Sequence, residues 1–118
     1  MARRNSYQRN MEEVQRYVYA LIFSDSRCYV GLTIEPSRRF RQHRSAWPDE
    51  FKPIVLDEVF GNVWECNRLE FAWRWAAQLA GWVVYASPDQ VFSNLETITW
   101  PEVKAVGEKL KWPSSISV

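Results

Sequence analysis

The chain alternates between short runs rich in β-branched and aromatic residues and longer runs with apolar residues at helical spacing. Three runs are of the first kind: residues 17–23 (YVYALIF), 28–33 (CYVGLT) and 54–60 (IVLDEVF). Runs of this composition between turn residues predict β-strands, and the polar segment SDSR at 24–27 predicts a hairpin from the first two. Residues 82–88 (WVVYASP) are compatible with either a short strand or a passage from helix to loop.

Helical spacing marks the remaining segments. Pro36 opens a predicted helix of about 11 residues with one apolar edge. Residues 65–81 predict a long helix, with Gly81 as its C-terminal cap. A third helix is expected from Pro101 and a weaker one over 6–16, whereas 93–98 looks irregular and 113–118 a frayed end. The stripe of the long helix comprises Cys66, Leu69, Trp73, Ala76, Ala77 and Ala80.

The order of these elements, β-β-α-β-α with additions, predicts a single α+β domain over residues 1–118. Its core is expected at about 17–100, with extra helices at both ends. Hydrophobic residues make up 47% of the chain, which excludes a disordered protein. No apolar run approaches the roughly 18 residues of a membrane span, so we expect no membrane partner and an intracellular, cytoplasmic location, with nucleoid association as an alternative.

Two cysteines and one histidine argue against a zinc site or a disulfide framework. We expect Cys28 and Cys66 to be reduced, buried thiols. The net charge of +1 is unevenly spread: residues 1–47 hold nine arginines, no lysine and four acidic residues, and residues 48–118 carry a net charge of −4. Because arginine pairs well with phosphate oxygens, the basic half suits a polyanion, although an ordinary solvated surface explains it equally well.

Tyrosine, arginine and histidine gather around the predicted hairpin. Arg39 lies eight residues after Gly31, and His43 lies four residues after Arg39. Residues four apart share one face of a helix. We therefore expect this guanidinium and imidazole to lie beside the strands that carry Tyr19 and Tyr29. Together they offer a proton acceptor, a charge clamp and a second polar group, which suits phosphate chemistry. The alternative is a pair of core aromatics and a surface histidine.

These residues resemble the motifs of the GIY-YIG nuclease family. The stretch YVY at 17–19 stands for G-I/V-Y, YVG at 29–31 for Y-I/V-G, and RRFRQH at 38–43 for the arginine and histidine of the family. The stretch LEFAWRW at 69–75 resembles the segment with the family's metal-binding glutamate, here Glu70, and is most similar to the branch that cuts branched DNA. The resemblance covers roughly residues 17–80 and implies a short antiparallel three-stranded sheet flanked by helices.

The resemblance implies an endonuclease that hydrolyses DNA phosphodiesters. Glu70 would hold one Mg²⁺ or Mn²⁺, which would stabilise the leaving 3′ oxygen and the scissile phosphate. Either Tyr19 or Tyr29 would activate water, with Arg39 and the metal lowering its pKa from about 10. Arg39 would neutralise the phosphate, and His43 would hydrogen-bond a tyrosine or the phosphate. A surface Glu70 paired with Arg74 is the simpler alternative.

Substrate contacts are expected from Gly31, where the backbone lets a phosphate approach, and from the cations Arg27, Arg38, Arg41 and Arg44. Tyr17 replaces the first glycine of the family motif, and Leu32 replaces a frequent lysine, for which Arg27 could substitute. Asn94 is the one candidate for a frequent asparagine of the family. The tryptophans at 73, 75 and 82 are expected in the core rather than as base-stacking platforms.

Two other functions fit the sequence. The same fold could bind nucleic acid without cutting it, or the chain could be a structural subunit that binds a protein partner. No appended recognition domain is recognisable, so specificity would come from a partner protein, a homodimer or the shape of the DNA. Metal-dependent cleavage and salt-dependent DNA binding distinguish these functions.

Overall fold

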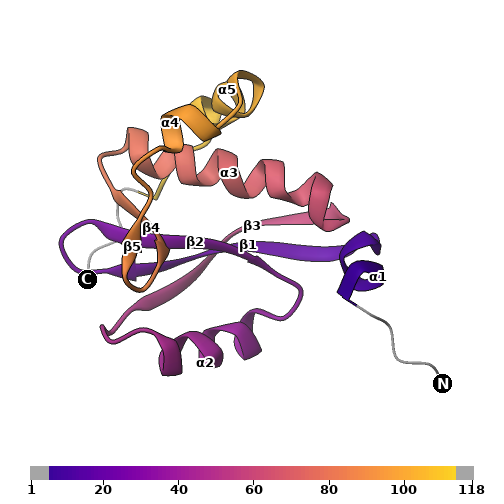
Figure 1. The fold of residues 1–118 in the computed structure, drawn as a ribbon, viewed down its shortest axis with the longest axis horizontal. Helices are drawn as coiled ribbons and strands as arrows, with labels where there is room; N and C mark the ends of the chain where they lie inside the picture. The colour runs from indigo at the N-terminus through magenta and orange to yellow at the C-terminus, as the bar shows by residue number, and fades with distance from the viewer. Residues whose placement is uncertain (1–5, 114–118) are drawn as a thin grey trace.

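A long antiparallel hairpin forms the centre of the molecule in the computed structural model, which describes residues 6–113 (Figure 1). Strand β1 (Val14–Phe23) pairs with β2 (Arg27–Thr33), with Tyr19 opposite Gly31. Asp25 and Ser26 both have positive φ angles, which a tight hairpin turn requires and Asp tolerates. The predicted hairpin is confirmed, and its first strand begins three residues earlier than expected.

The sheet has five strands in the order β3-β1-β2-β4-β5. Strand β3 (Lys52–Gly61) pairs antiparallel with β1, and the short β4 (Val83–Ser87) and β5 (Gln90–Val91) extend the other edge. The expected three-stranded antiparallel sheet is therefore wrong, because β4 runs parallel to β2. The chain reaches β4 after crossing the sheet through a helix, and a crossover of this kind permits parallel pairing. The α+β class is confirmed.

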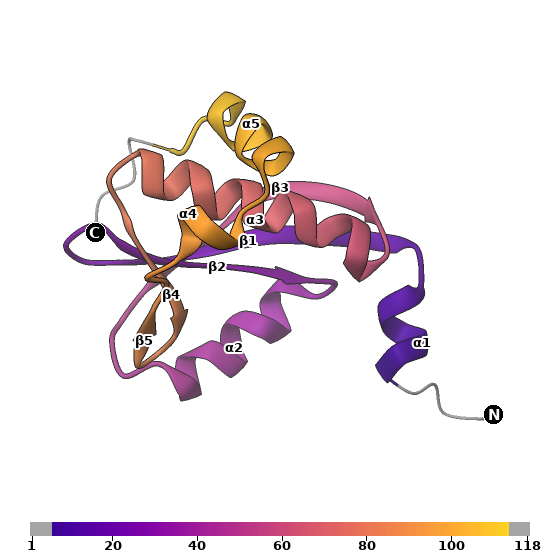
Figure 2. The ribbon, with the colours of Figure 1, turned by 45° about the horizontal axis from the view of Figure 1, so that its top comes forward.

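Helices cover both faces of the sheet (Figures 1 and 2). Helix α2 (Pro36–Ala46) lies on one face, and α3 (Val63–Leu79), α4 (Leu95–Ile98) and α5 (Pro101–Lys109) lie on the other. Helix α3 begins with a capping box, in which Asn62 and Glu65 bond each other's backbone N–H groups, and the chain turns at Gly81, whose φ angle is +92°. Within residues 6–113, no helix has the length and apolar character that a membrane crossing requires.

Alternate residues of β1 pack into two separate hydrophobic cores, one on each face of the sheet. Tyr19, Leu21 and Phe23 pack on the α2 side, with Trp47 and Phe51. The residues between them pack on the α3 side, a core that contains Val18, Ala20, Ile22, Cys28, Val30, Trp73, Ala76 and Ala77. Because β1 is central and covered on both faces, its apolar run is continuous rather than alternating. This alternation places both Tyr19 and Tyr29 on the α2 side of the sheet.

Several further predictions can be compared with the structure. The expected helix over 6–16 is wrong beyond α1 (Ser6–Met11), because Val14 and Arg16 pair with β3. Ala80, expected on the buried stripe, is exposed, whereas Trp73 and Trp75 are buried as expected, and Trp82 packs against the core. Residues 93–98, expected to be irregular, contain α4. Both cysteines are buried and free. The expected frayed end lies, beyond Pro113, outside the described residues.

Candidate active site

The hydroxyl of Tyr19 is the centre of a hydrogen-bonded cluster. The Tyr19 side chain is fully buried and points from β1 toward α2. Its oxygen lies 2.6 Å from Nε2 of His43 and 3.4 Å from Nε of Arg39, which donates to it. Both partners come from α2, one turn apart, so the expected shared helix face brings a guanidinium and an imidazole to the same tyrosine oxygen.

Both ring nitrogens of His43 form hydrogen bonds. While Nε2 faces Tyr19, Nδ1 accepts a hydrogen bond from the indole N–H of Trp47, at 3.1 Å. Burial lowers the pKa of His43 to about 4, with a further contribution from the charge of Arg39. The imidazole is therefore neutral at neutral pH. Trp47 was not predicted as a partner of His43, although its spacing of four residues already places it on the same helix face.

Tyr29 is the more accessible of the two tyrosines. It is partly exposed and lines a shallow hollow together with Arg39, His43 and Trp47. Its ring centroid lies 6.2 Å from that of Tyr19 and 5.1 Å from that of His43. Arg39 also lines a second hollow, next to Arg38 and Gln42. Arg39 and Tyr29 are thus the cluster members best placed to meet a ligand.

Burial raises the pKa of Tyr19 strongly, and the neighbouring Tyr29 raises it further through its charge and a hydrogen bond. Arg39 acts in the opposite direction, through its own hydrogen bond and its charge, but does not outweigh burial. The expectation that Arg39 and a metal ion together lower the pKa of a catalytic tyrosine stays a prediction. A fully buried, weakly acidic hydroxyl is poorly suited to take a proton from water.

The remaining predicted cations lie around this cluster. Arg38 pairs with Glu35 at 3.7 Å, Arg44 stacks over the ring of Phe51 at 4.9 Å, and Arg41 is exposed. All three are on α2 and leave their charge at the surface. Arg27, by contrast, lies at the hairpin turn, where it bonds Ser24 and, at 3.3 Å, Asp49.

Arg16, counted in the basic half of the sequence, is not part of this surface. Its guanidinium is buried and donates from Nε to the carbonyl oxygen of Gly61 at 2.9 Å. It also donates to the carbonyl oxygens of Arg9 and Glu12. Arg16 therefore joins α1 to the end of β3, so part of the positive charge of the first 47 residues has a structural role.

Glu70 lies on the opposite side of the sheet from the tyrosines. Its carboxylate is buried on α3 and forms an ion pair with Arg74 at 3.4 Å. The guanidinium of Arg74 also donates to the carbonyl oxygen of Val30, from Nε at 3.3 Å and from a terminal nitrogen at 3.2 Å. The alternative of a Glu70–Arg74 pair is confirmed, but the pair is buried rather than at the surface. It lies beside β2, just before Gly31.

At Glu70, a divalent cation would take water and phosphate oxygens for most of its ligands. Within residues 6–113, no group of three or more His, Cys, Asp or Glu side chains lies close enough to hold an ion. Mg²⁺ commonly keeps several waters and takes one or two carboxylates plus phosphate oxygens, so one carboxylate is compatible with it. Burial raises the pKa of Glu70, with Arg74 opposing that shift, so a desolvated carboxylate is present that a second cation would stabilise.

Residues 30–33 of β2 lie between the tyrosine cluster on one side of the sheet and Arg74 on the other. Strand β4 pairs with β2 only along Arg27–Tyr29, so no described strand covers residues 30–33 of β2 on that side. Val30 contacts Arg74 there, and Gly31 lies directly opposite Tyr19. The structure thus brings Tyr19, Tyr29, Arg39 and His43 together and places Glu70 apart from them, with this edge between. Asn94 lies elsewhere, at the start of α4.

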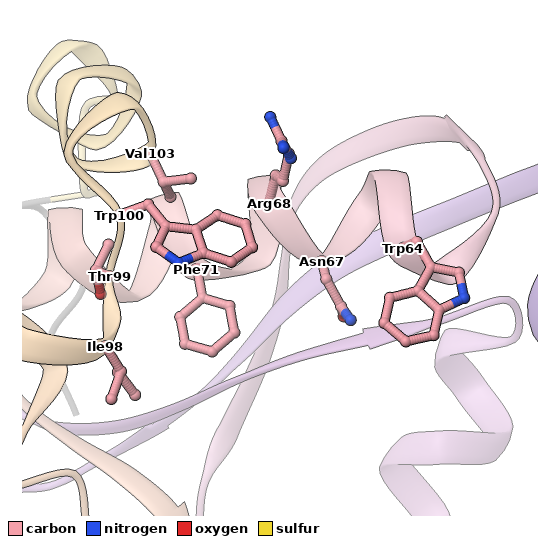
Figure 3. Close-up of a pocket in the computed structure, with 8 residues that line it drawn as sticks. All are labelled: Trp64, Asn67, Arg68, Phe71, Ile98, Thr99, Trp100 and Val103. Carbon is pink, nitrogen blue, oxygen red and sulfur yellow. The ribbon is translucent and has the colours of Figure 1, made fainter.

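A more apolar hollow lies on α3 and the segment before α5 (Figure 3). Two exposed tryptophans, Trp64 and Trp100, line it, and Arg68 stacks over Trp100 at 5.5 Å. Among the described residues that line this hollow, none is acidic and none is a tyrosine or histidine. Its side chains therefore offer no group for proton transfer at neutral pH, and we place the candidate active site at the cluster around Tyr19.

One segment of the chain matches a known protein family. Residues 15–56 match the family model described as the GIY-YIG catalytic domain, a nuclease family. This match confirms the resemblance of the segment that contains the two tyrosine motifs and the Arg39–His43 pair. The match does not extend to Glu70. No curated protein and no solved structure matches the chain significantly.

Proposed function

We propose that this protein is a metal-dependent endonuclease that hydrolyses DNA phosphodiester bonds. The observation that carries the proposal is the convergence of Arg39 and His43 on the Tyr19 oxygen, with Tyr29 open to the adjacent hollow. The Tyr19 hydroxyl bonds a neutral imidazole and accepts from the arginine, whose charge suits a phosphate. This arrangement belongs to the segment that matches the nuclease family.

In the proposed mechanism, Tyr29 is the group that accepts a proton from water. Tyr29 lines the hollow, whereas Tyr19 is fully buried, so an incoming water can reach only the former. The ionised Tyr29 takes the proton, the water oxygen bonds to phosphorus, and the bond from phosphorus to the leaving oxygen breaks. Arg39 stabilises the negative charge that grows on the phosphate oxygens.

Glu70 is the proposed ligand of one Mg²⁺ or Mn²⁺. When bound, the ion would supply charge stabilisation of the leaving oxygen and of the phosphate. For Glu70 and the tyrosines to act on one phosphodiester, the substrate has to lie over the uncovered edge of β2, near Gly31. The surface arginines of α2, Arg38, Arg41 and Arg44, would then contact the DNA backbone on either side.

Cleavage of a panel of DNA substrates tests the proposal. Single-stranded, duplex, flap and four-way DNA are incubated with Mg²⁺ or Mn²⁺, with EDTA as the metal-free control. We expect cleavage of at least one substrate by the wild type and none by Glu70→Gln, which should still bind DNA. Glu65→Gln is the matched control: it makes the same change on the same helix, and glutamine preserves the capping box. Equal cleavage by Glu70→Gln and wild type would contradict the role of Glu70.

The buried ion pair of Glu70 with Arg74 favours one other function. If that pair is permanent, the carboxylate never becomes available to a metal ion, and the domain binds nucleic acid without cutting it. Binding of DNA that weakens with salt, together with absent cleavage in Mg²⁺ and Mn²⁺, would identify this function. A chain that neither binds nor cuts DNA would instead be a subunit for a protein partner.

A further inference from the structure

The protons of the cluster around Tyr19 can be assigned from one contact. An indole N–H can only donate a hydrogen bond, so the 3.1 Å contact from Trp47 requires Nδ1 of His43 to be the acceptor and to carry no proton. A neutral imidazole has one protonated nitrogen, which must then be Nε2. In the 2.6 Å contact, His43 is therefore the donor and the Tyr19 oxygen the acceptor.

This direction constrains the hydroxyl of Tyr19. Its oxygen accepts from Nε2–H of His43 and from Nε–H of Arg39, which uses both of its lone pairs. The proton of Tyr19 must therefore point to a third group, and Tyr29, whose ring centroid lies 6.2 Å from that of Tyr19 on the same side of the sheet, carries the neighbouring hydroxyl. With the opposite tautomer, Tyr19 would donate its proton to His43 and have none for Tyr29.

We propose that Trp47 is a positioning residue, whose indole N–H holds His43 in the Nε2–H tautomer and thereby directs the hydroxyl proton of Tyr19 toward Tyr29. The sequence of donors runs from Trp47 to His43, from His43 to Tyr19, and from Tyr19 to Tyr29. A donated hydrogen bond stabilises an ionised oxygen more than a neutral one. Through this sequence of donors, Trp47 makes Tyr29 a more available proton acceptor. The kinetic part of this inference rests on the proposed function, whereas the tautomer does not.

The chain suits a direct measurement, because His43 is its single histidine. In protein labelled with ¹⁵N-histidine, two-bond ¹H–¹⁵N correlation spectra at neutral pH distinguish a protonated from an unprotonated ring nitrogen. We expect a protonated Nε2 and an unprotonated Nδ1 in the wild type. A protonated Nδ1 would overturn the inference, and this arm requires neither a variant nor a substrate.

The second arm compares two tryptophan variants. Trp47→Phe keeps most of the ring packing against Phe23 and Tyr85 but removes the donor. Trp75→Phe makes the same change at a tryptophan of similar burial whose N–H has no hydrogen-bond partner within the described residues. We expect Trp47→Phe to shift part of the His43 population to the Nδ1–H tautomer and Trp75→Phe to leave it unchanged. An unchanged tautomer in both variants would overturn the inference.

The third arm is kinetic. We expect Trp47→Phe to lower kcat on the order of 10-fold, the value of one supporting hydrogen bond, with KM unchanged. The rising limb of its pH–rate profile should move to higher pH, because Tyr29 has lost a donor, whereas Trp75→Phe should keep the wild-type profile. If no DNA is cut, the proposed function fails while the tautomer arm still decides the inference. If DNA is cut but the limb stays in place in Trp47→Phe, the inference fails and the proposed function stands.

Discussion

Gly31 lies so close to Tyr19 that the two residues cannot both carry ordinary side chains. A Cβ atom built at position 31 would be 2.5 Å from the tyrosine oxygen and 2.6 Å from the carbon that bears it, closer than real Cβ contacts. The two residues face each other across the β1–β2 pair. The glycine of the second motif therefore provides the space for the tyrosine of the first. This reason is separate from the expected approach of a phosphate, which stays a prediction.

Gly31→Ala should displace the Tyr19 hydroxyl and destabilise the fold by about 1–3 kcal/mol, as overpacking of a core typically does. We expect DNA cleavage to fall with it, even at a temperature where the variant is fully folded. Gly107→Ala is a suitable control, because its Cβ would meet the carbonyl oxygen of Ala72 at 2.6 Å, far from the cluster. Thermal melts and cleavage rates are compared for both. A Gly31→Ala protein with wild-type rate and melting temperature would contradict the steric account.

Removal of the two tyrosine hydroxyls should have different effects on the pH–rate profile. Tyr29→Phe should lose the rising limb of the pH–rate profile, because it lacks the proposed proton acceptor. Tyr19→Phe should keep a rising limb, at lower amplitude and moved to higher pH, because its buried hydroxyl orients Arg39 and His43 and is the proposed donor to Tyr29. The measurement is kcat against pH at saturating Mg²⁺, with circular dichroism to verify folding. Two fully active Phe variants would mean that both rings serve only the core.

Arg39 and Arg44 should separate catalysis from docking. Arg39→Ala removes a donor to Tyr19 and the charge nearest the proposed phosphate, so we expect a loss of about 10²-fold or more in kcat. Arg44→Ala removes an exposed cation that stacks on Phe51, so it should weaken DNA binding and flatten its salt dependence by about one unit of slope. Single-turnover rates and salt titrations provide the comparison. Identical behaviour of the two variants would refute this division.

Acid should destabilise the protein partly through His43. The pKa of this imidazole is about 4 in the folded protein against 6.5 in an ordinary environment. Between these values the unfolded chain binds a proton that the folded chain does not, so the free energy of unfolding falls as pH decreases from 6.5 toward 4. Glu70 acts in the opposite sense, because burial raises its pKa and the folded state takes up that proton more readily.

Comparison with His43→Gln isolates the histidine contribution, because glutamine does not titrate and its amide can still donate to Tyr19. Urea unfolding at several values of pH between 4 and 7 should give a shallower decline for the variant than for the wild type. Parallel declines would indicate that His43 titrates equally in the folded and unfolded chains.

Local patterns predicted most of the elements. The hairpin, α2 after Pro36, β3, α3 and α5 each follow from spacing, turn residues or proline position within about 20 residues of sequence. Two failures depend on distant contacts. Residues 14–16 are in a strand because they pair with the end of β3, and β4 lies parallel to β2 because α3 returns the chain across the sheet. Neither partner is visible from the local sequence.

The candidate site, too, was predicted from the sequence only in part. The shared helix face of Arg39 and His43 followed from their spacing, and the structure places both against Tyr19. The position of Glu70 did not follow, because helical spacing does not indicate on which face of the sheet the helix packs. Its partner Arg74 is oriented by a carbonyl oxygen 44 residues away in sequence, which no helical spacing can reveal. The catalytic roles of these residues stay predictions.

Trp47 is also the C-cap residue of α2, where its backbone N–H bonds the carbonyl oxygen of His43 at 2.8 Å. The same residue therefore ends the helix and donates to the imidazole. Insertion or deletion of one residue between positions 43 and 47 would rotate the indole by about 100° around the helix axis and remove it from Nδ1. Surface segments commonly tolerate changes of length, but positions 44–46 should tolerate substitution far better than insertion or deletion.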